Sequence, residues 1–153
     1  SPTQAARALK PCPPGANNCF STASTDKSRL ASWVWPKSMT RADAIASLES
    51  VLKAYPQTGV DGVDGGGWSL ADDQMETSGF QRYEFKSAGT GNLARFFNGG
   101  KPFVDDFQVS VELSSVCIRS SARQGDSDFG VNAKRVNYIA RSLRDAGWDA
   151  PSI

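Results

Sequence analysis

The stretch that decides the fold runs from Lys101 to Leu143 and reads KPFVDDFQVSVELSSVCIRSSARQGDSDFGVNAKRVNYIARSL. Apolar and polar residues alternate between Phe103 and Leu113, which is typical of a strand with one buried face. A second alternating run, from Val116 to Ser120, follows Ser114-Ser115. The sequence therefore predicts an antiparallel hairpin that turns at these two serines.

The position of the turn also fixes which residues of the two strands face each other. A turn at Ser114-Ser115 predicts that Val111 lies opposite Ile118 and, on the other face, that Asp106 lies opposite Arg123. The other pairs predicted by this register are Leu113–Val116, Val109–Ser120 and Ser110–Arg119.

A helix is predicted after the turn-rich segment 124–130. Asp128 lies near its start, where a carboxylate can cap free amides, and Gly147 follows its last periodic residues. The apolar residues with helical spacing are Val136, Ile139, Ala140 and Leu143, whereas Arg135, Arg141 and Arg144 are assigned to the more solvated faces.

Earlier in the chain, Thr40 and Asp43 have the spacing of a capping box and predict the start of another helix, which Pro56 and Gly59 end. The loop 60–67, VDGVDGGG, is interpreted as a plain flexible connection rather than a calcium loop, because it lacks the distal glutamate of an EF-hand. Strands are predicted from Trp68 and over Phe80–Lys86, with a short helical turn between Gly91 and Gly100. The residues expected on the buried face of the helix are Ile45, Leu48, Val51, Leu52 and Tyr55.

This order of elements predicts a single α+β domain, in which an antiparallel sheet carries helices packed on one face. Residues 1–39 are rich in proline and small polar residues and are expected to form an extended amino-terminal arm, with the domain proper at 40–153. The 153 residues suffice for one core. The net charge of +1 argues against nucleic acid as a partner, and no apolar run is long enough to span a membrane.

The side chains available for chemistry are limited, because the sequence contains no histidine. This excludes Ser-His and Cys-His nucleophile pairs, and no P-loop, dinucleotide-binding or serine-elbow motif is present. We therefore expect no enzyme activity, no cofactor and no metal site.

Cys12 and Cys19 lie in PCPPGANNC and either form a disulfide, which would imply an oxidising compartment, or remain free thiols. A zinc site is disfavoured, because Cys117 is the only other cysteine. The aromatic residues that could contact a partner, or else pack on the domain, are Trp33, Trp35, Phe96 and Phe97.

One constellation of acids and arginines remains, and it has three interpretations. In order of preference, it forms structural ion pairs, or Arg119, Arg123, Ser121 and the amino terminus of the predicted helix bind a phosphate or carboxylate, or paired aspartates carry out hydrolysis. Asp105 is the odd member, because it shares the face of Phe107 and is expected to pair with an arginine or with amides of the loop before the helix. The members are Asp105, Asp106, Arg119, Ser121, Arg123, Asp128, Asn132 and Arg135.

These residues also carry a resemblance, which extends over nearly the whole chain. The sequence resembles the family known as domain of unknown function 1499, with a phenylalanine and paired aspartates, an Arg-Ser-Ser-Ala-Arg segment, a Ser-Asp-Phe-Gly-Val-Asn segment and a late arginine. The family's amino-terminal Cys-Pro…Asn-Cys signature is matched with a longer spacer. The matching residues are Cys12, Pro13, Asn18, Cys19, Phe103, Asp105, Asp106, Arg119, Ser120, Ser121, Arg123, Gly125, Ser127, Asp128, Gly130, Asn132 and Arg135.

The resemblance implies a setting rather than a reaction, since members occur in bacteria and, often plastid-targeted, in photosynthetic eukaryotes. It implies a non-catalytic extrinsic or assembly subunit of a thylakoid membrane complex, with photosystem or light-harvesting proteins as partners. The side of the membrane stays open, and the lumen is favoured if Cys12 and Cys19 are bonded. The alternatives are a soluble protein that binds small anions and, less favoured, an aspartate-dependent hydrolase.

Overall fold

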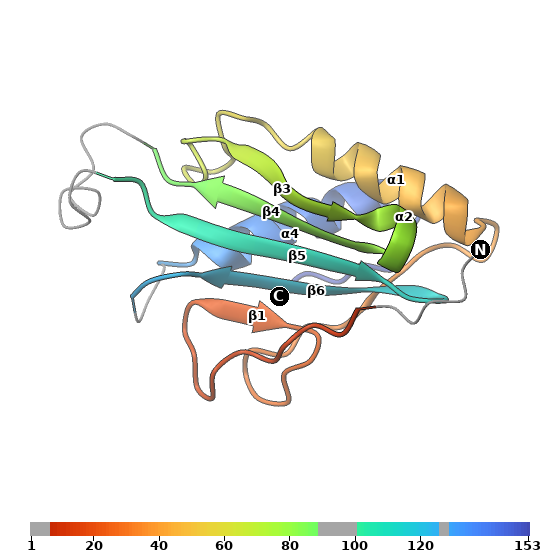
Figure 1. Ribbon diagram of the computed structural model, residues 1–153, viewed down its shortest axis with the longest axis horizontal. Coiled ribbons are helices and arrows are strands. Elements are labelled where there is room, and N and C mark those ends of the chain that lie inside the picture. Colours follow the sequence, from red (N-terminus) through yellow and green to blue (C-terminus); the bar gives the residue numbers. More distant parts are fainter. Residues whose placement is uncertain (1–6, 89–100, 126–128) are drawn as a thin grey trace.

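The computed structural model describes residues 7–88, 101–125 and 129–153. All strands pair antiparallel in one sheet of order β1-β6-β5-β4-β3, and β2 also pairs with β6. In Figure 1, α4 lies behind the sheet and α1 runs along its β3 side. The elements are β1 (Cys19–Ser21), β2 (Trp33–Val34), α1 (Arg41–Lys53), β3 (Trp68–Gln74), α2 (Met75–Ser78), β4 (Phe80–Lys86), β5 (Val104–Val111), β6 (Ser115–Ala122) and α4 (Val131–Asp145).

The hydrophobic core lies between the sheet and the two long helices. Residues that alternate along β4, β5 and β6 pack against α1 and α4, as a one-sided sheet requires. This arrangement confirms the predicted α+β fold with helices on one face. The largest apolar side chains in this layer are Trp33, Tyr55, Tyr83, Phe85, Phe107, Leu48, Ile118, Ile139 and Leu143.

The amino-terminal segment supplies two strands that the sequence did not predict, because β1 and β2 both pair with β6. Trp33 and Trp35, which were candidates for partner contact, are only 1% and 8% exposed and belong to the core. Of the two interpretations of these tryptophans, packing on the domain is confirmed and partner contact is wrong. Phe96 and Phe97 lie outside the described residues.

The hairpin of β5 and β6 has the predicted faces but not the predicted register. Val111 lies opposite Val116 rather than Ile118, and Asp106 lies opposite Ser121 rather than Arg123. The turn residues are Leu113 and Ser114, because Glu112 N donates to Ser115 O at 2.8 Å. The shift is two residues, so every side chain stays on its predicted face. Arg119 consequently lies opposite Gln108 rather than Ser110.

The two long helices begin and end near the predicted positions. Thr40 and Asp43 form the capping box of α1, each side chain accepting from the other's backbone amide. Helix α4 begins after Gly130, which adopts the left-handed conformation without a side-chain cap. Asp128, the predicted cap, lies outside the described residues. Among the described residues, no helix is both long and apolar enough to cross a membrane.

Candidate functional site

The paired aspartates of β5 point to opposite sides of the sheet. Asp105 is buried on the helix-covered face beside Phe107, whereas Asp106 lies on the outer face, which neither α1 nor α4 covers. Each takes part in its own group of acids and arginines. We call these groups the inner cluster (Asp64, Asp105 and Arg135) and the outer cluster (Arg82, Glu84, Asp106 and Arg123).

Arg135 is the centre of the inner cluster and is fully buried. Its Nε donates to Asp64 Oδ2 at 2.8 Å, and its Nη2 donates to Asp64 Oδ1 at 2.5 Å and to Asp105 Oδ2 at 2.8 Å. Its guanidinium also lies 4.7 Å from the ring centre of Phe85. The prediction that Asp105 pairs with an arginine is therefore confirmed.

Neutral groups complete the hydrogen bonding around Arg135. Its Nη1 donates to Asn132 Oδ1 at 2.8 Å and to Ser120 Oγ at 3.1 Å. Tyr55 Oη, at the end of α1, donates to Asp64 Oδ2 at 2.7 Å. A buried charge is tolerated only when it is paired and hydrogen-bonded in this way.

The prediction that Arg135 faces solvent is wrong. Arg135 precedes Ile139 and Leu143 by four and eight residues, so it lies on the buried face of α4. Asp64 was also missed, since its loop was interpreted as a plain connection. Within that loop, Asp61 and Gly62 have positive φ angles and form the tight turn typical of an Asp-Gly pair, with Val60 and Val63 bonded on either side.

Asp64 itself adopts a φ of 60°, a conformation that is unfavourable for most residues. The neighbouring backbone packs closely against Asp64. Gly59 also has a positive φ, and a Cβ on Gly59 would clash with the carbonyl oxygen of Val63 and with the backbone of Asp64. The strained position places the Asp64 carboxylate under Arg135, and this pairing compensates for the strain. The loop is thus an anchor for the buried charge.

The pKa directions of Arg135 and Tyr55 follow from burial and from their partners. Burial lowers the pKa of Arg135, but the hydrogen bonds and charges of Asp64 and Asp105 outweigh burial and raise it above its ordinary value. The pKa of Tyr55 is raised, first by burial and then by the charge of Asp64. Arg135 therefore keeps its charge, and Tyr55 keeps its proton, near neutral pH.

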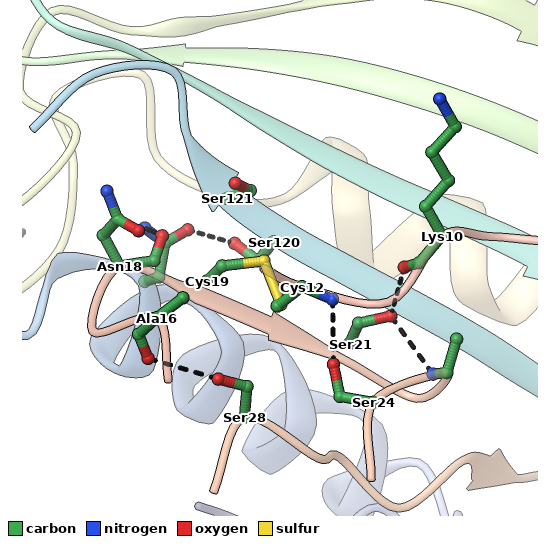
Figure 2. Close-up of a disulfide and its surroundings, with 12 residues drawn as sticks. Lys10, Cys12, Ala16, Asn18, Cys19, Ser21, Ser24, Ser28, Ser120 and Ser121 are labelled. Carbon is green, nitrogen blue, oxygen red and sulfur yellow. Dashed lines mark hydrogen bonds between the residues drawn. A yellow bond between two sulfur atoms is a disulfide. The ribbon is translucent and has the colours of Figure 1, made fainter. Parts of the chain in front are cut away.

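The arm joins this network through Asn18. Asn132 Nδ2 donates to Asn18 O at 3.2 Å, and Asn18 Nδ2 donates to Gly125 O at 2.6 Å. The next residue, Cys19, forms a disulfide with Cys12 (Figure 2). Of the alternatives that the sequence left open for these cysteines, the structure contains the disulfide.

The outer cluster is open to solvent on one side. Arg123 binds Asp106 through two hydrogen bonds, at 2.8 and 2.9 Å, and Glu84 at 2.9 Å. Arg82 bridges the same two carboxylates at 2.7 and 2.9 Å. Burial raises the pKa of Asp106, but Arg123 and Arg82 outweigh it, so the pKa is lowered overall. A carboxylate held ionised in this way is a poor general acid near neutral pH.

With this geometry in place, comparison with known proteins gives one match. The model of the family described as protein of unknown function DUF1499 matches residues 8–143. The chain belongs to the DUF1499 family. No curated protein and no solved structure gives a match.

Seven of the DUF1499 residues quoted from the sequence take part in one of two groups. Ser120, Asn132 and Arg135, with Asp105 and Asn18, belong to the buried network, whereas Asp106 and Arg123 belong to the outer cluster. Ser121 only donates to the adjacent Ala122 O at 3.2 Å. In the described part of the chain, no three His, Cys, Asp or Glu side chains are grouped so as to hold a metal ion.

Arg119 and Arg123, which the sequence placed together in an anion pocket, have different surroundings. Arg123 is saturated by Asp106 and Glu84, as described above. Arg119 Nε is buried and has no hydrogen-bond partner among the described residues. The two arginines therefore do not form the single pocket that was predicted for this DUF1499 chain.

Proposed function

We propose that this chain is a non-catalytic assembly subunit that binds a partner protein through the outer face of its sheet. The observation that carries the proposal is the burial of Asp105, Asn132 and Arg135, none of which is more than 6% exposed. Since these side chains bond to one another, they are unable to reach a substrate. Their contacts connect α4 to β5 and to the loop of Asp64, and the outer face of the sheet is the surface available for binding a partner protein.

The chemistry of the outer face favours a protein as the partner. Positive and negative side chains alternate there across β4, β5 and β6, with Arg82, Glu84, Asp106 and Arg123 in contact with one another. Such a mixed surface gives no net attraction to nucleic acid or to an anionic membrane, but it can complement a protein surface of matching charges.

The partner that we propose is a subunit of a photosynthetic membrane complex at the thylakoid, with photosystem or light-harvesting proteins as the first candidates. Support for this setting comes from the occurrence of DUF1499 members in photosynthetic eukaryotes. The Cys12–Cys19 disulfide fits an oxidising compartment and favours the lumenal side.

The alternative of an aspartate-dependent hydrolase has less support, because Arg135 holds Asp105 and two arginines hold Asp106. A site that binds a small anion is compatible with a subunit role.

Native-gel separation of gently solubilised source membranes, followed by mass spectrometry, tests the proposal. We expect this chain to migrate with a large membrane complex. Migration of the chain alone would contradict a subunit role.

A charge reversal can locate the binding surface in the same assay. Arg123→Glu changes the outer face and should release the chain from the complex. Lys134→Glu makes the same charge change on an exposed position of α4, at the opposite side of the sheet, and should leave the chain bound. Equal retention of both variants would exclude the outer face as the interface.

A further inference from the structure

A pocket lies between the arm and the outer face of the sheet, next to the outer cluster, since Gln108 of its wall lies opposite Arg82. Its volume is about 370 Å³. Arg7 and Lys10 contribute from the arm, Phe80 from β4, Gln108 from β5 and Arg119 from β6. Ala8 and Leu9 complete the wall.

The arm is held firmly where it forms this wall. Ser110 Oγ donates to Arg7 O at 2.6 Å, and Ser21 Oγ donates to Lys10 O at 2.7 Å (Figure 2). Two residues further on, Cys12 is bonded to Cys19, which lies opposite Ser121 and therefore on the outer face. These contacts hold the pocket in a preformed shape, which reduces the entropy lost when a ligand binds.

Arg119 is the unusual residue of the pocket. Its Nε is buried without a hydrogen-bond partner, although a buried donor that lacks an acceptor is rare and costly in native proteins. Its neighbours across the strands are Gln108 and Ser21, neither of which is charged. The guanidinium therefore lacks the acceptor that its fork of N–H groups is built to bind.

The charge around the pocket points to an anion. Among the residues that the structure describes, three cationic side chains line it, Arg7, Lys10 and Arg119, and no acidic side chain does. The nearest carboxylates are otherwise engaged, since Asp106 is held by Arg82 and Arg123. Asp72 Oδ2 lies 3.8 Å from Arg7 Nη1 in a loose, exposed ion pair. The guanidinium carbon of Arg7 lies 3.9 Å from the ring centre of Phe80.

We propose that this pocket binds a phosphate group, which accepts hydrogen bonds from Arg119 while Lys10 and Arg7 neutralise its charge. A doubly charged phosphate matches the cationic side chains of Arg119, Lys10 and Arg7, of which Arg7 is only loosely paired with Asp72, better than a carboxylate with a single charge does. The phosphate could belong to a soluble molecule or to a lipid headgroup, because both present the same oxygens. The site lies on the same outer face as the proposed protein interface, but it is lined by no residue of the outer cluster.

Titration of the purified, oxidised chain with inorganic phosphate tests the proposal by calorimetry and by amide chemical shifts. We expect saturable binding that moves the signals of Arg119 and of residues 7–10. Arg119→Gln should weaken binding roughly tenfold or more, because a charge-assisted pair is lost. Arg119→Lys retains the charge but not the fork and should lie in between.

Arg141→Gln is the matched control, because it removes one positive charge from α4 at a distance from the pocket. It should leave phosphate affinity within about twofold of the parent chain, the residual effect of a remote surface charge. If Arg119→Gln does not fold, Lys10→Gln carries the test, since Lys10 is exposed and contributes to binding without supporting the core.

Vesicles of phosphatidylcholine, with and without phosphatidic acid, separate the two sources of phosphate. Binding to inorganic phosphate indicates a soluble ligand, and binding only to vesicles with phosphatidic acid indicates a headgroup. Either result supports the site if Arg119→Gln or Lys10→Gln weakens the binding. No binding in both assays would overturn the proposal, as would binding that the Arg119 and Lys10 variants leave unchanged.

Discussion

The inner and outer clusters place the same side-chain types on the two faces of one sheet, one residue apart along β5. Asp105 is 6% exposed and meets a fully buried arginine, whereas Asp106 meets two arginines that water also reaches. Breaking a buried pair leaves a charge that has lost both its partner and its hydration. Breaking an exposed pair leaves a charge that water solvates. The two clusters should therefore differ greatly in their effect on stability.

The largest effect is expected from the centre of the inner cluster. Arg135→Gln leaves Asp64 and Asp105 buried together without a cation, so the free energy of unfolding should fall by about 3–5 kcal/mol. Urea unfolding followed by circular dichroism measures this change. Arg123→Gln, the same substitution in the outer cluster, is the control; similar losses in the two variants would remove the distinction between the clusters.

Removal of one buried carboxylate should have the next largest effect. Asp64→Asn takes away the partner that binds Nε and Nη2 of Arg135, and we expect a loss of about 3 kcal/mol. Asparagine tolerates the positive φ angle at this position, so the backbone adds little to the change. Asp105→Asn should cost less, because Arg135 keeps Asp64. A greater loss for Asp105→Asn would show that β5, and not the loop, anchors the arginine.

A smaller effect is expected from Tyr55→Phe, which removes one neutral donor from Asp64. Hydrogen bonds to charged groups contribute about 1.5–3 kcal/mol, and we expect the lower value because Arg135 still binds Asp64. Thermal unfolding measures the difference. No loss in this variant would mean that the Tyr55 hydroxyl adds nothing to the network.

Tyr55 also predicts a dependence on pH. Since its pKa is raised in the folded state, the stability it contributes is complete below its unfolded value of 10.0 and is lost as the pH rises above it. Unfolding measured from pH 8 to 11 should show a shallower alkaline decline in Tyr55→Phe than in the parent chain. Parallel declines would contradict the raised pKa.

The smallest effect is expected in the outer cluster. Arg123→Gln should lower stability by less than about 1 kcal/mol at neutral pH, and added salt should reduce the difference. The pKa of Glu84 is lowered by Arg82, and that of Asp106 is lowered overall by Arg123 and Arg82 despite burial. This stabilisation is therefore present above the unfolded values of 4.5 and 3.8 and disappears as both acids become protonated in the folded state. A difference that persists at pH 2 would have to arise from packing.

The alternating pattern of β5 and β6 was sufficient to predict the sheet and its faces, but not the register. A two-residue shift keeps Phe107, Val109 and Val111 on the core face, so the pattern within the paired strands is equally satisfied by both pairings. The turn decides between them, and Leu113, which was assigned to the buried face, is 85% exposed at its tip. The pairing of Asp106 with Arg123 survives the shift because the two are diagonal neighbours.

The inner cluster was only half predictable. Asp105 was recognised as an acid on a buried face, and the helical spacing of Arg135 with Ile139 and Leu143 could have placed that arginine opposite it. Asp64 gave no comparable signal. Its role depends on a left-handed backbone conformation, and on a distance to Arg135 that only the folded chain defines.

The docking of the amino-terminal arm, through β1 and β2, on the sheet has a consequence for the order of folding. Asn18 bonds to Asn132, 114 residues away, and Arg7 to Ser110, 103 residues away, whereas the Cys12–Cys19 disulfide spans seven. Contacts of such long range form slowly, and a chain made from its amino end must wait for β6 and α4 before the arm can dock. The loop closed by the Cys12–Cys19 disulfide can form early, so this part of the arm is already ordered when it docks on the finished sheet.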